Sequence, residues 1–174
     1  MKTILVTGGS GYIGSHTSLS LLLSGFRVII LDSNINSHQN SLKRIMKIGN
    51  DKYLDFEERL FFAKGDIRDE RLLDNIFKKA NLKGINIDAV IHFAGLKSVK
   101  ESISNPISYW DNNVKGSINL FKAMANNNCN IIVFSSSATV YGKQPISPID
   151  ESSSLNPINP YGETKVAVEK ILED

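Results

Sequence analysis

Two residue types that can move a proton lie four positions apart near the end of the chain, Tyr161 and Lys165. On a helix this spacing places both side chains on one face, one turn apart. A phenol is a poor base at neutral pH because its ordinary pKa is about 10. A neighbouring ammonium would stabilise the phenolate and lower that pKa. A surface helix with an unrelated tyrosine and lysine has the same spacing, so the interpretation depends on the surrounding elements.

A run of three serines at 135–137 precedes this pair and stands at the end of an apolar segment. Residues 131–135 are predicted to form a strand. The hydroxyl of Ser137 could hydrogen-bond the oxygen whose proton Tyr161 removes. One or two of the serines are explained equally well as the polar end of the strand. We therefore predict that Tyr161, Lys165 and Ser137 form a catalytic set.

The start of the chain carries a glycine-rich turn between a predicted strand, at residues 2–7, and a helix. Gly8, Gly11 and Gly14 follow that strand with the spacing G-x-x-G-x-x-G. The first glycine permits the tight turn, the second lets a pyrophosphate approach the backbone, and the third lets the helix pack closely on the strand. The helix N-terminus then offers N–H groups to phosphates. An ordinary strand–helix turn is the alternative, but the order of elements favours nucleotide binding.

An acidic residue ends the next predicted strand, at residues 27–31. Asp32 could bind both ribose hydroxyls of an adenosine, and its charge would repel a 2′-phosphate. The following residue is Ser33 rather than an arginine, which favours NAD over NADP. The alternative is that Asp32 only caps a turn.

Composition sets the class of protein. The chain has 174 residues, of which 41% are hydrophobic and 22% charged, and its net charge is +2, so we expect one domain with a core. Nothing indicates disorder, a basic stripe for nucleic acid, a membrane span or a signal peptide. The single cysteine, Cys129, excludes an internal disulfide and favours a cytoplasmic location and an apolar structural role. His16 and His92 lack metal-ligand spacing and are interpreted as structural, so no metal is expected.

Strands and helices are predicted to alternate along the chain. Further strands are expected at 60–64 and 89–93. Helices are expected up to Ser24, within the polar stretch 33–58, from Asp69 as a cap to Ala80, from Asn105-Pro106 and from Asn159-Pro160, with a loop at 142–159. The helix from Pro106 is given an apolar face made of Ile107, Trp110, Val114, Ile118, Phe121 and Ala125.

This alternation predicts an α/β fold with a Rossmann-like, doubly wound parallel sheet in the order 3-2-1-4-5. Ligands should bind where the strands end. The features expected at that edge are the glycine turn, Asp32, Asp66, residues 93–95 and the serines at 135–137.

The sequence resembles the extended short-chain dehydrogenase/reductase family and, within it, the UDP-glucose 4-epimerase branch. The segments that carry the resemblance span most of the chain: 6–17, 65–68, 91–97, 109–114, 134–142 and 160–165. Residues 36–58 match least. Dehydratases of the family place an Asp-Glu pair where this chain has Ala138 and Thr139, which argues against dehydration.

The resemblance implies a role for each candidate residue. Tyr12 and Ile13 would bind the pyrophosphate through backbone N–H groups, Asp66 and Ile67 would flank the adenine, and Lys165 would bind the nicotinamide ribose while tuning Tyr161. The implied cofactor-binding set is Gly8, Gly11, Tyr12, Ile13, Gly14, Asp32, Ser33, Asn36, Ser37, Asp66, Ile67, Phe93, Ala94, Gly95, Lys97, Asn112, Tyr161 and Lys165.

The resemblance also implies a reaction, the interconversion of UDP-glucose and UDP-galactose through a transient 4-keto sugar with tightly bound NAD. Another UDP-sugar epimerase or decarboxylase stays open, as does a non-catalytic NAD-binding module, although a sensor would not need Tyr161, Lys165 and Ser137 together. Members of the family continue past this point and form homodimers. We therefore expect residues 1–174 to be an incomplete NAD-binding domain without its substrate domain, with little turnover by itself.

Overall fold

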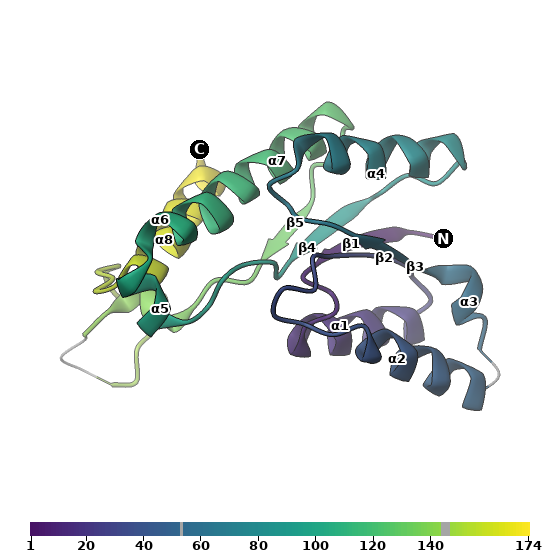
Figure 1. Ribbon diagram of the computed structural model, residues 1–174, viewed down its shortest axis with the longest axis horizontal. Coiled ribbons are helices and arrows are strands. Elements are labelled where there is room, and N and C mark those ends of the chain that lie inside the picture. Colours follow the sequence, from purple (N-terminus) through teal and green to yellow (C-terminus); the bar gives the residue numbers. More distant parts are fainter. Residues whose placement is uncertain (53, 144–146) are drawn as a thin grey trace. The chain divides into compact units, whose positions relative to one another are not determined.

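The computed structural model of the chain describes residues 1–52, 54–143 and 147–174 (Figure 1). These residues divide into two compact units. Unit 1 consists of Met1–Ala94 and Asn119–Phe134, and unit 2 consists of Gly95–Ile118 and Ser135–Asp174. Residue 53, in the stretch 33–58, and residues 144–146, in the loop predicted at 142–159, lie outside the described residues.

Unit 1 holds a parallel sheet whose strands are in the order β3-β2-β1-β4-β5, so the predicted fold class and strand order are confirmed. The strands are β1 (Thr3–Thr7), β2 (Arg27–Asp32), β3 (Leu60–Lys64), β4 (Ala89–His92) and β5 (Ile132–Phe134). Strand β3 has the predicted bounds, whereas β5 is shorter than predicted. Strands β1 and β2 are buried almost throughout, as expected for parallel strands covered on both faces.

Helices cover the two faces of this sheet (Figure 1). One face packs against α1 (Tyr12–Leu23), α2 (Asn40–Asp51) and α3 (Phe56–Arg59) through a core of buried apolar side chains. The other face packs against α4 (Glu70–Leu82) and the part of α7 (Gly116–Asn126) that belongs to unit 1. Cys129 is buried on this second face as a free thiol, as the sequence predicted, and burial raises the pKa of the thiol.

The strand register brings the binding features of unit 1 to one edge. Thr7 is level with both Leu31 and His92, and Asp32 is level with Lys64. The glycine turn, Asp32, Asp66 and residues 93–94 all follow these strand ends. Their predicted convergence at one edge is confirmed within unit 1.

Unit 2 is built around α8 (Pro160–Glu173). Against it pack α5 (Val99–Ser104), α6 (Pro106–Tyr109), the π-helix η1 (Trp110–Lys115) and the 3₁₀ helix η2 (Ala138–Tyr141). Asn159 caps α8 as predicted, because its side-chain oxygen accepts a hydrogen bond from the Gly162 N–H at 2.9 Å. The described residues of the predicted loop at 142–159 form no helix or strand.

The helix predicted from Pro106 begins where expected, but its predicted apolar face is only partly right: Phe121 packs against the core of unit 1, whereas the first residues of the face are exposed. Asn105 gives no side-chain cap bond, and Ile107 and Trp110 are 76% and 38% exposed. The buried side chains are instead Tyr109, Asn113 and Ser117. Two causes explain the error: the π-helix at 110–115 changes the helical period, and hydrogen bonds allow polar side chains to be buried.

Candidate functional site

The glycine turn of unit 1 is shaped by close backbone packing. Gly8 has a φ of +68°, which favours glycine, and a Cβ there would lie 2.7 Å from the backbone nitrogen of Ala94. A Cβ on Gly14 would overlap the carbonyl oxygen of Gly8. The turn therefore needs glycine at both positions, and α1 begins directly against it.

The N-terminus of α1 is open to an anion. Gly11 is its N-cap residue and provides no side-chain cap bond, and the first turn carries no acidic residue. Tyr12 and Ile13 are 79% and 58% exposed, so their side chains make little contact with the turn. What this end of the helix offers is a set of backbone N–H groups and the positive end of the helix dipole.

Asp32 is 6% exposed and its carboxylate is held on both oxygens. One oxygen accepts from the Ser10 N–H at 2.9 Å. The other accepts from the Asn34 N–H at 2.9 Å and the Ser37 hydroxyl at 2.7 Å. Asp32 thus caps the turn that follows β2, the alternative considered for it, and also presents a fixed carboxylate beside the glycine turn.

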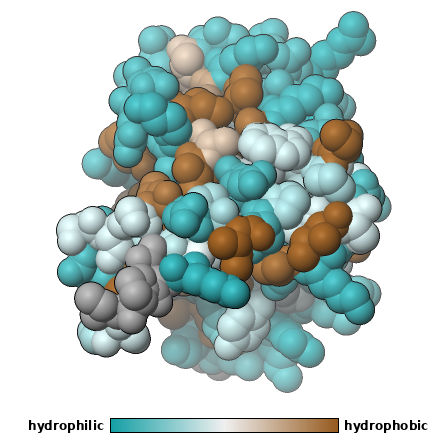
Figure 2. Space-filling view, turned by 90° about the vertical axis from the view of Figure 1, so that its left-hand side faces the viewer, coloured by the Kyte–Doolittle hydropathy of each residue, from teal (hydrophilic) through white to brown (hydrophobic). Residues whose placement is uncertain are grey.

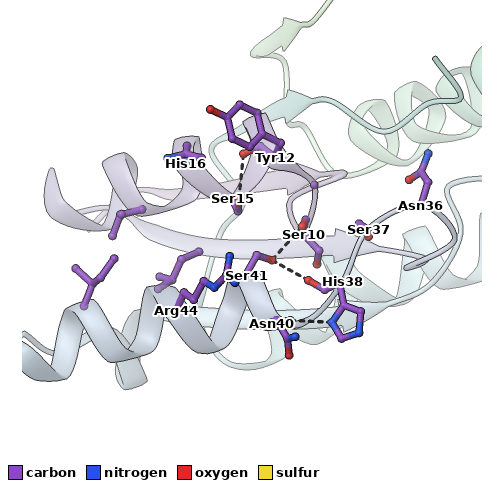
Figure 3. A pocket seen from close by; sticks show the side chains of 14 residues that line it. Ser10, Tyr12, Ser15, His16, Asn36, Ser37, His38, Asn40, Ser41 and Arg44 are labelled. Carbon is purple, nitrogen blue, oxygen red and sulfur yellow. Dashed lines mark hydrogen bonds between the residues drawn. The ribbon is translucent and has the colours of Figure 1, made fainter. Parts of the chain in front are cut away.

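A pocket of about 540 Å³ lies between α1 and α2, beside this carboxylate (Figure 3). Four predicted cofactor-binding residues line it: Gly11, Tyr12, Asn36 and Ser37. Its basic lining residues are His16, His38 and Arg44, and none of the described residues that line it carries a carboxylate. The pocket therefore favours a polar or anionic ligand group.

The hydroxyl of Ser10 also belongs to this pocket. The residue is 4% exposed, its Oγ has no hydrogen-bond partner in the described part of the chain, and its carbonyl accepts from the Ser41 hydroxyl at 2.9 Å. A buried hydroxyl without a partner is costly and is explained if a ligand supplies the partner. Ser10 was not among the predicted site residues, since serine in a glycine turn is also common as a small spacer.

The remaining predicted residues of unit 1 follow the ends of β2, β3 and β4. Ser33 is half-buried, and Asp66 pairs with the Arg68 guanidinium at 2.7 Å. Ile67 is buried in the core, so its side chain supports the sheet. Phe93 is half-buried, and the Ala94 N–H donates to the Thr7 hydroxyl at 3.3 Å.

In unit 2 the ammonium of Lys165 lies next to the ring of Tyr161. Lys165 is 6% exposed, and its Nζ lies 5.9 Å from the centre of the Tyr161 ring. The Nζ donates to the Ser135 carbonyl at 2.8 Å. Burial lowers the pKa of Lys165 from 10.5 to about 8, and the charge of Glu169 opposes that shift. Tyr161 and Lys165 are therefore neighbours in unit 2, as their spacing of four residues predicted.

Tyr161 is 9% exposed, and Tyr109 packs edge-on against it with ring centres 6.3 Å apart. Tyr109 is fully buried, and its hydroxyl accepts from the Ser98 N–H at 3.0 Å and lies 2.8 Å from the Ser98 carbonyl. Burial is the main cause of the raised pKa of Tyr109, followed by its hydrogen bond to Glu101. Tyr109 is thus a neutral packing partner that sequence reasoning missed, because only tertiary contacts distinguish it from other aromatic residues.

The hydroxyl of Ser137 keeps its own hydrogen available to a ligand. Ser137 is half-buried at the start of η2, and its Oγ accepts from the Thr139 N–H at 3.3 Å and from the Thr139 hydroxyl at 2.9 Å. Neither bond uses the hydrogen of the serine. An oxygen that approaches this position could therefore accept it.

Asn113, rather than its neighbour, fixes the backbone after β4. Its Oδ1 accepts from the Leu96 N–H at 2.8 Å, and its Nδ2 donates to the Leu96 carbonyl at 3.0 Å and the Thr164 hydroxyl at 3.2 Å. The predicted Asn112 is only half-buried, Lys97 is exposed, and a Cβ on Gly95 would lie 3.2 Å from the Asn113 Oδ1. The sequence shows two adjacent asparagines, Asn112 and Asn113, and so indicated a polar contact at this place. It does not show which of the two side chains is buried.

Known proteins with similar sequences and structures match nearly the whole chain. Residues 5–174 match a family model described as GDP-mannose 4,6 dehydratase. The chain belongs to this family. It is 45% identical over all 174 residues to UDP-glucose 4-epimerase 2 of Oryza sativa subsp. japonica. It is 46% identical over 173 residues to the bifunctional UDP-glucose 4-epimerase and UDP-xylose 4-epimerase 1 of Pisum sativum.

A structural relative of the family is the UDP-glucose 4-epimerase from Bifidobacterium longum in complex with NAD+ and UDP. It matches 99% of this chain with a TM-score of 0.89 and 42% identity. The chain spans 48% of that protein, and 40% and 47% of the rice and pea proteins. The resemblance to UDP-glucose 4-epimerases therefore covers essentially the whole chain, which spans less than half of each relative.

Residues 1–52, 54–143 and 147–174 contain neither a cluster of metal-binding side chains nor a membrane-spanning helix. No group of three or more His, Cys, Asp or Glu side chains that could hold a metal ion occurs there. His16 is exposed, and the ring Nδ1 of the buried His92 lies 2.6 Å from the Thr7 hydroxyl. No helix in the same residues is long and apolar enough to span a membrane.

Proposed function

We propose that the protein interconverts UDP-glucose and UDP-galactose as an NAD-dependent 4-epimerase. The observation that carries the proposal lies in unit 2, where the buried Lys165 ammonium lies 5.9 Å from the centre of the buried Tyr161 ring and the half-buried Ser137 retains a hydrogen to donate. A proton-transfer group of this kind fits the relatives that are named as UDP-glucose 4-epimerases. The role in galactose metabolism is part of this proposal.

The residues of unit 1 fit NAD. The glycine turn leaves no room for a Cβ at positions 8 and 14, the N-terminus of α1 has no side-chain cap, and Asp32 presents a fixed carboxylate that suits ribose hydroxyls. The unpartnered hydroxyl of Ser10 provides a further donor in the same place. A 2′-phosphate would bring negative charge towards Asp32, so NAD is favoured over NADP.

When bound, NAD would accept a hydride from C4 of the sugar and return it to the opposite face. Tyr161 would remove the proton of the 4-hydroxyl, and Ser137 would hydrogen-bond the same oxygen. With a pKa of about 8, Lys165 is largely protonated at pH 7, so its charge would stabilise the Tyr161 phenolate. Lys165 would also bind the nicotinamide ribose, as in the family that the chain resembles.

A second candidate is epimerisation of a related UDP-sugar. The pea relative is named for activity on both UDP-glucose and UDP-xylose, which favours this alternative over a decarboxylase or a non-catalytic module. Dehydration is disfavoured, because Ala138 and Thr139 offer no acid where dehydratases carry an Asp-Glu pair.

We also propose that the protein works in the cytoplasm as a homodimer. The free, buried thiol of Cys129 is compatible with a reducing compartment. Exposed apolar side chains on α5, α6 and η1, namely Ile103, Ile107 and Trp110, are candidates for the interface. Brown apolar side chains among teal polar ones are visible on the face shown in Figure 2. Sedimentation of the full-length protein should give twice the monomer mass, and a monomer would contradict the proposal.

The epimerase proposal is tested on a protein extended to the length of these relatives. Purified protein is mixed with UDP-galactose without added NAD, the reaction is stopped, and UDP-glucose is separated from UDP-galactose and measured by chromatography. Formation of UDP-glucose without added cofactor is the expected result. Conversion of UDP-xylose alone would favour the second candidate, and protein that holds NAD but converts neither sugar would contradict both.

A further inference from the structure

Two hydrogen bonds join α8 to the segment that follows β5. The Lys165 Nζ donates to the Ser135 carbonyl at 2.8 Å, and the Ser136 hydroxyl donates to the Glu169 Oε1. Lys165 and Glu169 are four residues apart on α8, while the two serines are consecutive. The segment is therefore held at two successive residues by two side chains one helical turn apart, and all four residues belong to unit 2.

Ser136, which is bonded to α8 through Glu169, directly precedes Ser137 in the chain. Because Ser136 is bonded to Glu169, the position of the Ser137 hydroxyl depends on a side chain that itself lies outside the predicted catalytic set. The same carboxylate is the charged group whose field acts on Lys165, and it opposes the effect of burial on the pKa of that ammonium. One side chain thus acts on two members of the set.

Several other ionisable residues lie on the elements packed against α8, and most of them have partners of their own. They are Lys100, Glu101, Tyr109, Asp111, Lys115 and Tyr141. Glu101 is bonded to the Tyr109 hydroxyl at 3.1 Å, and Asp111 pairs with Lys115 at 3.2 Å. Glu169 is half-buried, so its charge is less screened than that of a surface carboxylate.

We propose that Glu169 is a positioning residue for the proton-transfer set, holding Ser136 through its carboxylate and balancing the charge of the Lys165 ammonium. This proposal rests on the function proposed above for Tyr161, Lys165 and Ser137. Sequence reasoning did not select Glu169, which is one of several acidic residues in a charged helix end.

The test measures the titration of Lys165 in the chain itself. The pH dependence of Lys165 acylation by acetic anhydride is followed by mass spectrometry in the wild type and in Glu169→Gln. The amide keeps an oxygen that can accept from Ser136 but removes the charge. The midpoint for Lys165 should fall by about 1 pH unit, because burial then acts without an opposing charge.

Glu173→Gln is the matched control, because Glu173 lies on the same helix but pairs with the exposed Lys170 at 3.4 Å. It should leave the midpoint of Lys165 unchanged. A Glu169→Gln midpoint equal to that of the wild type would overturn the proposal. So would a higher midpoint, which would mean that the substitution had loosened the helix and exposed the ammonium.

Ser136→Ala tests the hydrogen bond separately, in the full-length protein. It keeps both charges but frees the segment, so kcat should fall about tenfold while KM for UDP-galactose stays nearly constant. An unchanged kcat would overturn the positioning role of the bond. Because the titration of Lys165 needs neither NAD nor turnover, a failure of the epimerase proposal and a failure of the Glu169 proposal give different results.

Discussion

Asp32 in unit 1 and Lys165 in unit 2 are equally buried, at 6% exposure each, but their charges are stabilised very differently. Asp32 accepts three hydrogen bonds from its own neighbourhood, two of them from backbone N–H groups. The ammonium of Lys165 donates to the Ser135 carbonyl, and burial lowers its pKa to about 8. One charge is firmly fixed, and the other is close to losing its proton at physiological pH.

This difference matches what each group is proposed to do. A ribose-binding carboxylate has to remain an acceptor of constant orientation, which backbone donors ensure. A lysine that lowers the pKa of a phenol has to act in a region of low dielectric. Its electric field is strong there, but the ammonium loses its own proton more easily. The comparison therefore separates a binding role, built from backbone geometry, from a proton-transfer role, built from packed side chains.

Removing the phenol should separate the two roles most strongly. In the full-length protein, Tyr161→Phe should lower kcat for UDP-galactose by about a thousandfold, since the phenol proposed to remove the proton is then missing. Affinity for NAD, measured by calorimetry, should remain the same. Glu173→Gln is the control, because that side chain is 71% exposed near the end of the same helix and should affect neither quantity. Retained turnover in Tyr161→Phe would remove the basis for the role of unit 2.

Glycine substitutions should sharpen the account of unit 1. Gly8 and Gly84 share a φ of +68°, but a Cβ at Gly84 meets no atom within 4 Å whereas one at Gly8 meets Ala94 at 2.7 Å. Gly84→Ala should cost about 1–2 kcal/mol of unfolding free energy from backbone strain alone. Gly8→Ala should cost about 2–3 kcal/mol more, because the turn has to move, and should weaken NAD binding.

Urea denaturation measures both costs, and binding of NAD is titrated in parallel. Equal destabilisation by the two substitutions would mean that the close approach of Gly8 to Ala94 contributes nothing, and the steric account of the turn would then be wrong.

The buried ammonium should make stability depend on pH. Below pH 8 the folded and unfolded chains both carry the proton, so the folded chain bears the full cost of burying the charge. Between pH 8 and 10.5 the folded chain loses the proton first, and its stability rises relative to a variant without the group. Relative to Lys165→Met, the wild type should therefore gain about 2 kcal/mol of unfolding free energy between pH 7 and pH 9.5.

Guanidinium denaturation of both proteins at the two pH values provides the measurement. A difference in unfolding free energy that stays constant with pH would show that Lys165 titrates near its ordinary pKa, and the contrast with Asp32 would then be lost.

The regular part of the fold was predictable because its signals are local. Short apolar runs between polar turns located the strands, down to the bounds of β3, and the caps Asp69 and Asn159 were visible in the sequence because capping involves residues three positions apart. The glycine turn was predictable for the same reason.

The rest of the candidate site depends on packing between distant segments. The π-helix after α6 changes which residues face inward, so Asn113 and Tyr109 are buried where a regular period predicted Ile107 and Trp110. Ser10 and Glu169 are informative only once their partners are known: a missing partner for one, and Ser136 for the other. No local pattern encodes those contacts.

The most direct test of the central claim is calorimetric titration of NAD and NADP into the purified chain, after checking for cofactor that was carried through purification. The account predicts that NAD binds, or is already present, and that NADP binds at least about tenfold more weakly, a difference of about 1.4 kcal/mol. Failure to bind either dinucleotide, or equal affinity for both, would contradict the assignment of the glycine turn and Asp32 as an NAD site.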